Sequence, residues 1–182
     1  MHIYNKQTIN LKSDNLTLLF YGIKKHLFLN TAISIVCLSG SVFLLVQINK
    51  YLNVLIILVL AILCAALVLY FLKLRQGLEK KFYSANTLSE KVNKIKEFSQ
   101  MNFTKLKYIS AINNPLIIIV GSFFYRYYKY SFGRYTDVKD IVVLILFLII
   151  GYISRLIAAN YVFKQFNLKI ETLLVLNSVE KL

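Results

Sequence analysis

The segment YLNVLIILVLAILCAALVLYFL, residues Tyr51 to Leu72, decides the fold class. It contains 22 residues and no charged side chain. A helix needs about 20 mostly apolar residues, within a range of about 17–25, to cross the hydrocarbon core of a bilayer. Because unpaired backbone groups are costly in lipid, such a run is expected to be helical. The segment therefore predicts a transmembrane helix.

Two further runs support the same interpretation. Leu27 to Ile48 is another stretch of 22 residues without a charge, and it begins too far into the chain for a signal peptide. A last run begins at Val138 or Ile141 and continues to about Phe163, with Arg155 inside it. Both runs are long enough to span a bilayer.

The run from Tyr108 to Tyr125 is more ambiguous. It has 18 residues, but the sequence Asn113-Asn114-Pro115 interrupts it. Proline lacks a backbone donor, and the residue before it disfavours helix. This run is predicted as the third of four spans, with a short re-entrant or interfacial segment as the alternative.

Composition agrees with a membrane protein. The chain of 182 residues is 58% hydrophobic yet carries a formal net charge of +14, whereas soluble domains are typically about 45–50% apolar. The charges are excluded from the long runs and crowded between them, which is typical of a membrane protein and not of a basic nucleic-acid-binding protein. No nucleic-acid partner is expected.

The basic residues also predict the orientation. With four spans, 17 of the 22 Lys and Arg residues fall on the side of the two termini and the middle segment, and five on the other side. Positive residues favour the cytoplasmic side. We therefore expect both termini in the cytoplasm, and a bacterial cytoplasmic membrane as the location.

The predicted fold is an all-α integral membrane protein with four transmembrane helices in two hairpins, plus cytoplasmic amphipathic helices. The expected parts are an N-terminal amphipathic segment (1–26), hairpin one (27–72), a basic amphipathic helix (73–107), hairpin two (108–163) with an external aromatic loop (126–140), and a C-terminal amphipathic helix (164–182). The amphipathic parts rest on apolar residues that recur at steps of three and four.

The middle segment carries the candidate contact residues. It holds nine basic and three acidic residues, and its candidate lysines for lipid or partner contact are Lys80, Lys81, Lys91, Lys94 and Lys96. One interpretation places the apolar stripe in the membrane and the lysines on anionic lipid. A second pairs the helix with the same helix of a neighbouring subunit, and a third docks it to another cytoplasmic protein.

One family resemblance involves this segment. A two-span hairpin followed at once by the basic stretch RQGLEKKFYSANTLSEKVNKI, from Arg75 to Ile95, looks somewhat like the two-span SLATT effector domains of bacterial nucleotide-signalling defence. The resemblance covers about residues 24–98 and rests on pattern, and the second hairpin is not part of it. It implies an oligomeric, pore-forming or membrane-perturbing effector.

Residues suited to catalysis or metal binding are scarce where they would be needed. All eight acidic residues lie outside the apolar cores, and both histidines, His2 and His26, precede the first span. A nucleophile in a span therefore has no base, and a proton-coupled transporter would lack its usual intramembrane acid or histidine. We expect no enzyme activity, no cofactor and no metal site.

Arg155 is the one charge inside a long apolar run. If the fourth span ends at Ser154, Arg155 lies at the cytoplasmic interface; if it continues to Phe163, the side chain snorkels from the inner leaflet. The functional alternative is a residue that lines a pore or binds a lipid headgroup.

The stretch FFYRYYKYSFGRY, from Phe123 to Tyr135, is predicted to mark the external end of the third span. Tyrosine is enriched at membrane interfaces, because its ring is apolar and its hydroxyl polar. The candidate interfacial residues are Tyr125, Tyr127, Tyr128 and Tyr130. An external partner or ligand surface is the alternative.

The sequence thus favours a non-enzymatic, small multi-pass membrane protein with a structural or regulatory role. It would engage lipid or a partner through its basic cytoplasmic helix, and it could form homo-oligomers. The alternative is the oligomeric pore-forming effector.

Overall fold

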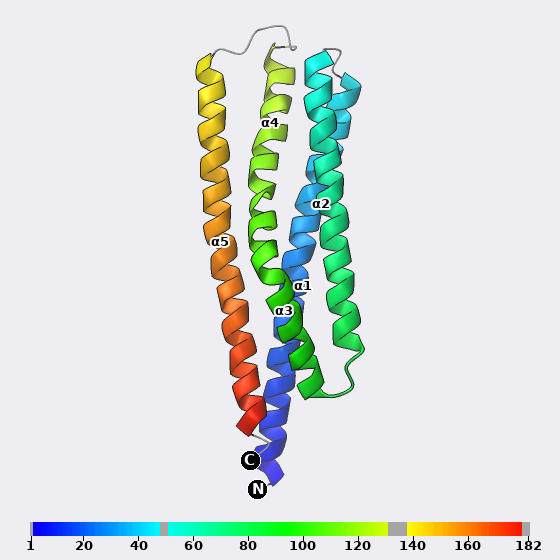
Figure 1. Ribbon diagram of the computed structural model, residues 1–182, viewed down its shortest axis with the longest axis vertical. Helices are drawn as coiled ribbons and strands as arrows, with labels where there is room; N and C mark the ends of the chain where they lie inside the picture. The colour runs from blue at the N-terminus through cyan, green and yellow to red at the C-terminus, as the bar shows by residue number, and fades with distance from the viewer. Residues whose placement is uncertain (1, 48–50, 131–137, 180–182) are drawn as a thin grey trace.

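The chain forms a long bundle of helices (Figure 1). The computed structural model describes residues 2–47, 51–130 and 138–179. These residues form the helices α1 (His2–Gln47), α2 (Tyr51–Tyr83), α3 (Leu88–Ala111), α4 (Asn113–Tyr130) and α5 (Val138–Val179). Within these ranges there is no strand, so the all-α prediction is confirmed for the described chain.

Within the described ranges, four segments are long and apolar enough to cross a membrane. They lie within Ser13–Gln47, Asn53–Tyr83, Leu88–Tyr128 and Val142–Leu176. The predicted number of candidate spans is therefore confirmed by length and composition. The start of α1 and the end of α5 lie at the same end of the bundle, as two hairpins require (Figure 1).

The predicted terminal segments are not separate helices. From His2 onward, the predicted N-terminal segment 1–26 is continuous with the first predicted span in α1, and the predicted C-terminal segment 164–182 continues α5 as far as Val179. With 46 residues, α1 is about 69 Å long, more than twice the roughly 30 Å of a bilayer core. Lys and His interrupt an apolar pattern but not a helix, so the change of polarity near residue 26 marks no helix end.

The third apolar run contains a helix junction. α3 ends at Ala111 and α4 begins at Asn113, with Ile112 between them. Pro115 falls in the first turn of α4, where a missing N–H breaks no intrahelical hydrogen bond. α3 and α4 follow each other end to end as one column (Figure 1). The asparagine and proline residues therefore restart the helix and do not end the run.

The predicted basic helix 73–107 is wrong as a single element, because the chain turns between Tyr83 and Leu88. Thr87 caps α3: its Oγ1 accepts a hydrogen bond from the N–H of Glu90 at 3.2 Å. The carboxylate of Glu90 accepts one in return from the N–H of Asn86 at 3.0 Å. This arrangement is a close variant of the capping box, and the pattern Thr-x-x-Glu was available in the sequence.

The predicted apolar stripe of the middle segment is buried inside the chain. Leu78, Phe82, Val92, Ile95 and Phe98 all belong to the main core cluster. The same core contains the predicted faces of the terminal segments, with these buried members: Leu16, Leu19, Phe20, Ile23, Ile170 and Leu173. The stripe thus packs on the chain's own helices, which leaves the lysine side of the segment for other contacts.

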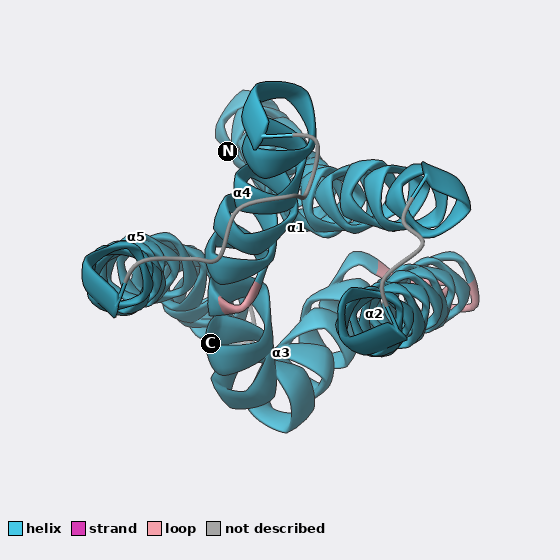
Figure 2. Ribbon diagram, turned by 90° about the horizontal axis from the view of Figure 1, so that it is seen from above, coloured by secondary structure: helices cyan, strands magenta, loops and turns pink. Residues whose placement is uncertain are grey.

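The packing order places α1 against α2, α3 against α5, and α4 against both α1 and α5. Viewed along the long axis, α2 and α5 lie on opposite sides of the bundle, with α3 and α4 between them (Figure 2). Little of the apolar window of α5 is buried inside the chain. Its exposed residues are those expected to face lipid.

Candidate functional site

The predicted lysines gather around the corner that joins α2 to α3. We call this set the basic corner: Lys80, Lys81, Lys91, Lys94 and Lys96. Nζ of Lys81 lies 2.8 Å from a carboxylate oxygen of Glu97, and Nζ of Lys94 lies 2.8 Å from one of Glu90. Five lysines against two glutamates leave the corner a net charge of +3.

The five lysines differ in what holds them. The ammonium group of Lys91 lies 5.1 Å from the ring centroid of Phe82, in cation–π geometry. Lys94 also donates to the hydroxyl of Ser84 at 3.1 Å. Lys80 and Lys96 are exposed and form no ion pair with any described residue. These two side chains are the most available for an external anion.

A second set of polar residues is buried between α1 and α4. Asn30, Ser34 and Asn113 are fully buried. Nδ2 of Asn113 donates to Oδ1 of Asn30 at 2.8 Å, and the hydroxyl of Ser34 donates to Oδ1 of Asn113 at 3.1 Å. Nδ2 of Asn30 donates to the carbonyl of His26 at 2.8 Å. The cluster is internally satisfied and serves to join the helices.

Arg155 lies on α5 and is half-buried. Its Nε atom, like Nε2 of His26 on α1, is buried without a hydrogen-bond partner in the described part of the chain. The two residues are close enough to interact electrostatically, and the ring of His26 meets Phe163 edge-on at 5.0 Å between centroids. The structure thus directs part of Arg155 towards α1 inside the bundle.

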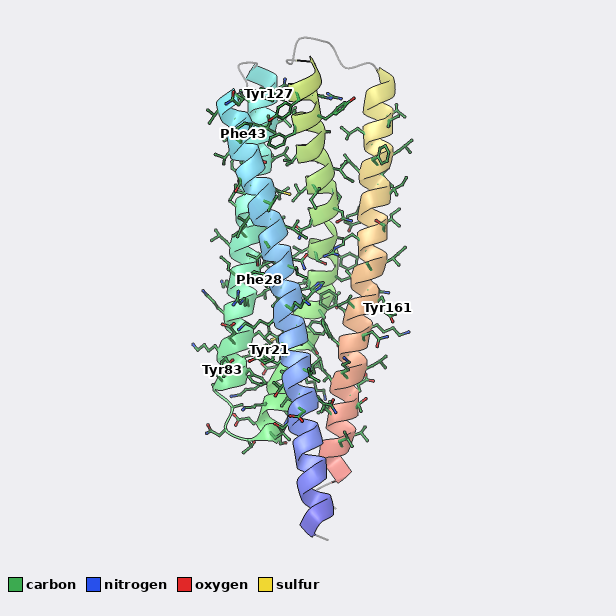
Figure 3. The ribbon with its side chains drawn as sticks, turned by 180° about the vertical axis from the view of Figure 1, so that it is seen from behind. Tyr21, Phe28, Phe43, Tyr83, Tyr127 and Tyr161 are labelled. Carbon is green, nitrogen blue, oxygen red and sulfur yellow. The ribbon has the colours of Figure 1, made fainter. Side chains whose placement is uncertain are left out.

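The candidate interfacial tyrosines do not share one environment. The hydroxyl of Tyr127 lies 3.0 Å from Oε1 of Gln47, at the end of α1, and its ring meets Phe43 edge-on (Figure 3). Tyr125 and Tyr128 are exposed. The side chain of Tyr130 and residues 131–137 of the predicted aromatic loop lie outside the described residues. Tyr127 thus joins α4 to α1, a contact that the aromatic pattern did not predict.

The two cysteines meet where the first hairpin packs. Cys37 on α1 and Cys64 on α2 are both buried free thiols, and both belong to the main core cluster. Within the described residues, no group of three or more His, Cys, Asp and Glu side chains could hold a metal ion.

Comparison of the chain with protein-family models, with curated proteins and with solved structures finds no match. A function must therefore be inferred from the chain's own geometry. Its most distinctive exposed feature is the basic corner, since the polar cluster of Asn30, Ser34 and Asn113 is closed off by its own hydrogen bonds.

Proposed function

We propose that the protein is a non-enzymatic, multi-pass membrane component with a structural or regulatory role. In this proposal both termini lie in the cytoplasm, and the basic corner engages an acidic surface of a cytoplasmic partner. The observation that carries the proposal is the corner itself: five lysines stand on two helices that are fixed to each other by the Lys81–Glu97 ion pair and by a shared apolar core.

The position of the corner favours a protein partner over the lipid surface. The apolar run of α2 ends at Leu72, eight residues before Lys80, and the third apolar run begins after Lys107, eleven residues beyond Lys96. These lysines therefore lie beyond the apolar runs by a distance of about 12–16 Å. The headgroup layer occupies only about 5–8 Å of it. The remaining distance of roughly 4–11 Å is comparable to the Debye length at physiological salt, about 8 Å. Attraction to anionic headgroups falls off over that distance.

The alternative of an oligomeric pore has less support. A water-filled pathway would need polar side chains that face outward from each subunit's spans. Of the polar residues of the first span, Asn30, Ser34 and Ser41 are buried, and each makes a hydrogen bond within the chain. Ser39 is exposed. The exposed surface of α5 is apolar along most of its membrane segment.

The test compares two charge-reversal variants of the full-length protein. In the first, Lys80→Glu and Lys96→Glu change the two exposed lysines of the corner that form no described ion pair. In the matched control, Lys105→Glu and Lys169→Glu change two exposed lysines elsewhere on α3 and α5. Each variant is purified in mild detergent from its own membranes, and the mass of the complex is measured.

We expect a partner of defined stoichiometry to remain with the wild type and the control and to be lost from the corner variant. The complex should also dissociate as salt is raised, because exposed charges are screened. If the corner variant retains the same complex as the control, the proposal fails. Leakage of liposomes that contain the purified protein would favour the pore.

A further inference from the structure

A groove lies between α3 and α5, where the third apolar run begins and the fourth ends. Its volume is about 410 Å³, within the range of about 300–1,000 Å³ typical of small-ligand sites. None of its lining residues belongs to the basic corner. We call it the α3–α5 groove.

The sequence places this groove at the edge of the membrane. Lys107 is the last residue before the third apolar run, and Lys164 is the first residue after the fourth. Both lysines line the groove. Nζ of Lys107 approaches Oδ1 of Asn160 at 3.5 Å, so the two helices are joined across the groove at this level. The groove therefore lies where lipid headgroups are expected.

The lining is divided into an apolar floor and a polar rim. Phe103 and Phe163 are buried, and their ring centroids are 4.9 Å apart. The rim includes Thr104 and Asn160 together with the two lysines. A phospholipid has the same division, with a charged phosphate above an apolar glycerol-ester region.

The charge of the lining favours an anion. Two lysines face one carboxylate, that of Glu171, which leaves a net charge of +1. A lysine binds phosphate as a point charge with three donors. Basic pockets between spans on the cytoplasmic side suit the headgroups of anionic lipids. A zwitterionic headgroup brings its own cation close to the lysines and is disfavoured.

We propose that the α3–α5 groove binds the phosphate of an anionic phospholipid from the leaflet on the side of the termini. Lys107 and Lys164 contact the phosphate, Thr104 and Asn160 donate hydrogen bonds to it, and Phe103 and Phe163 contact the glycerol region. The proposal uses none of the residues of the basic corner, so it stands or falls separately from the partner described above.

The experiment measures lipid binding to the purified full-length protein by native mass spectrometry. Phosphatidylglycerol and phosphatidylcholine are titrated in parallel. The groove variant carries Lys107→Gln and Lys164→Gln. The control carries Lys25→Gln and Lys73→Gln, which remove the same charge at the same membrane edge of hairpin one. Because each lysine near the surface contributes about 1 kcal/mol, we expect the groove variant to bind phosphatidylglycerol about 30-fold more weakly.

Glu171→Gln provides the opposite change. Removing the carboxylate from the lining should tighten phosphatidylglycerol binding several-fold, which a misfolded protein would not show. Equal binding of phosphatidylglycerol by the groove variant and the control overturns the proposal, as does equal affinity of the wild type for both lipids. Glycerol 1-phosphate, added without lipid, tests whether a soluble phosphate ester is the ligand of the groove. If it binds as tightly as phosphatidylglycerol through the same lysines, a free phosphate ester is the ligand and the lipid assignment is wrong.

Discussion

Nδ2 of Asn113 lies 2.8 Å from Oδ1 of Asn30, and this hydrogen bond joins residues 83 positions apart in the chain. Both side chains are fully buried. The bond fixes the start of α4 against α1, at the point where the α3–α4 column restarts after Ile112. Together with the bond from Ser34 to Asn113, it forms a buried polar link between the two hairpins.

The Asn30–Asn113 pair should show energetic coupling. Asn113→Ala leaves Oδ1 of Asn30 without its donor in an apolar setting, so we expect a loss in the free energy of unfolding of roughly 1–3 kcal/mol. A double-mutant cycle with Asn30→Ala should give a coupling of roughly 1–2 kcal/mol, measured by denaturant unfolding in detergent. Ser122→Ala, which removes only a local bond to the carbonyl of Ile119, is the control. Coupling near zero would show that the pair does not hold the hairpins together.

Replacement of Gly40 and of Gly77 by alanine should change the stability of the protein in opposite directions. A Cβ at Gly40 would lie 2.9 Å from Cγ1 of Val120 and 3.0 Å from Cε2 of Phe124, whereas a Cβ at Gly77 meets nothing within 4 Å. Gly77→Ala should stabilise α2 by up to about 1 kcal/mol. Gly40→Ala should destabilise the protein by roughly 1–3 kcal/mol through overpacking. Thermal unfolding in detergent distinguishes the two variants. An equal rise in the unfolding temperature of both would contradict the close α1–α4 contact.

The ion pair between Lys24 and Glu79, which lie outside the apolar runs, should make the free energy of unfolding depend on pH. Nζ of Lys24 lies 2.7 Å from a carboxylate oxygen of Glu79, which Arg75 also approaches at 3.3 Å. The bond from Lys24, with a smaller effect of Arg75, lowers the pKa of Glu79. Because the folded-state pKa is depressed, this stabilisation is fully present above the unfolded carboxylate's usual pKa. It disappears as pH falls through the lowered value.

Glu79→Gln should therefore cost about 0.2–1 kcal/mol at pH 7, as expected for a partly exposed pair. At a pH below the lowered pKa, wild type and variant should unfold at the same temperature. Lys169→Gln, which changes an exposed lysine without a described ion pair, should show no such convergence. A difference between wild type and Glu79→Gln that persists unchanged into acid would contradict the role of the pair.

The two cysteines provide a distance test of the first hairpin. Cys37 and Cys64 are neighbours in the core of α1 and α2. Treatment of membranes with a small, membrane-permeant oxidant should join them within one chain, which non-reducing electrophoresis and mass spectrometry detect. Cys64→Ala should abolish the product. Cross-links that form only between chains would show that the hairpin packs differently.

The coarse architecture could be predicted because it depends on local pattern. The number of spans follows from uncharged runs such as Tyr51 to Leu72. The buried faces of the helical segments outside the apolar runs follow from apolar spacing, as Leu16, Phe20 and Ile95 illustrate. Helix boundaries were harder to predict from the sequence, because the lysines near residue 26 mark a change from polar to apolar residues but not the end of a helix. At Thr87 the capping signal was present but outweighed by the regular apolar spacing on either side of it.

The candidate sites depended on tertiary structure to different degrees. The lysines of the basic corner could be identified from charge and spacing, but the ion pairs that occupy Lys81 and Lys94 could not. The α3–α5 groove brings together Lys107 and Lys164, which are far apart in sequence and carry no shared motif. The same holds for the contact between Tyr127 and Gln47, since no local pattern records which helices become neighbours.

We propose that four spans cross the membrane and continue as one bundle on the cytoplasmic side. Single-cysteine labelling tests it most directly, in a background with Cys37→Ala and Cys64→Ala. Tyr128→Cys and Asn86→Cys place exposed thiols near opposite ends of the bundle. With a membrane-impermeant maleimide on intact cells, we predict labelling at position 128, and labelling at position 86 only after permeabilisation. The reverse pattern, or labelling of both positions in intact cells, would contradict the account.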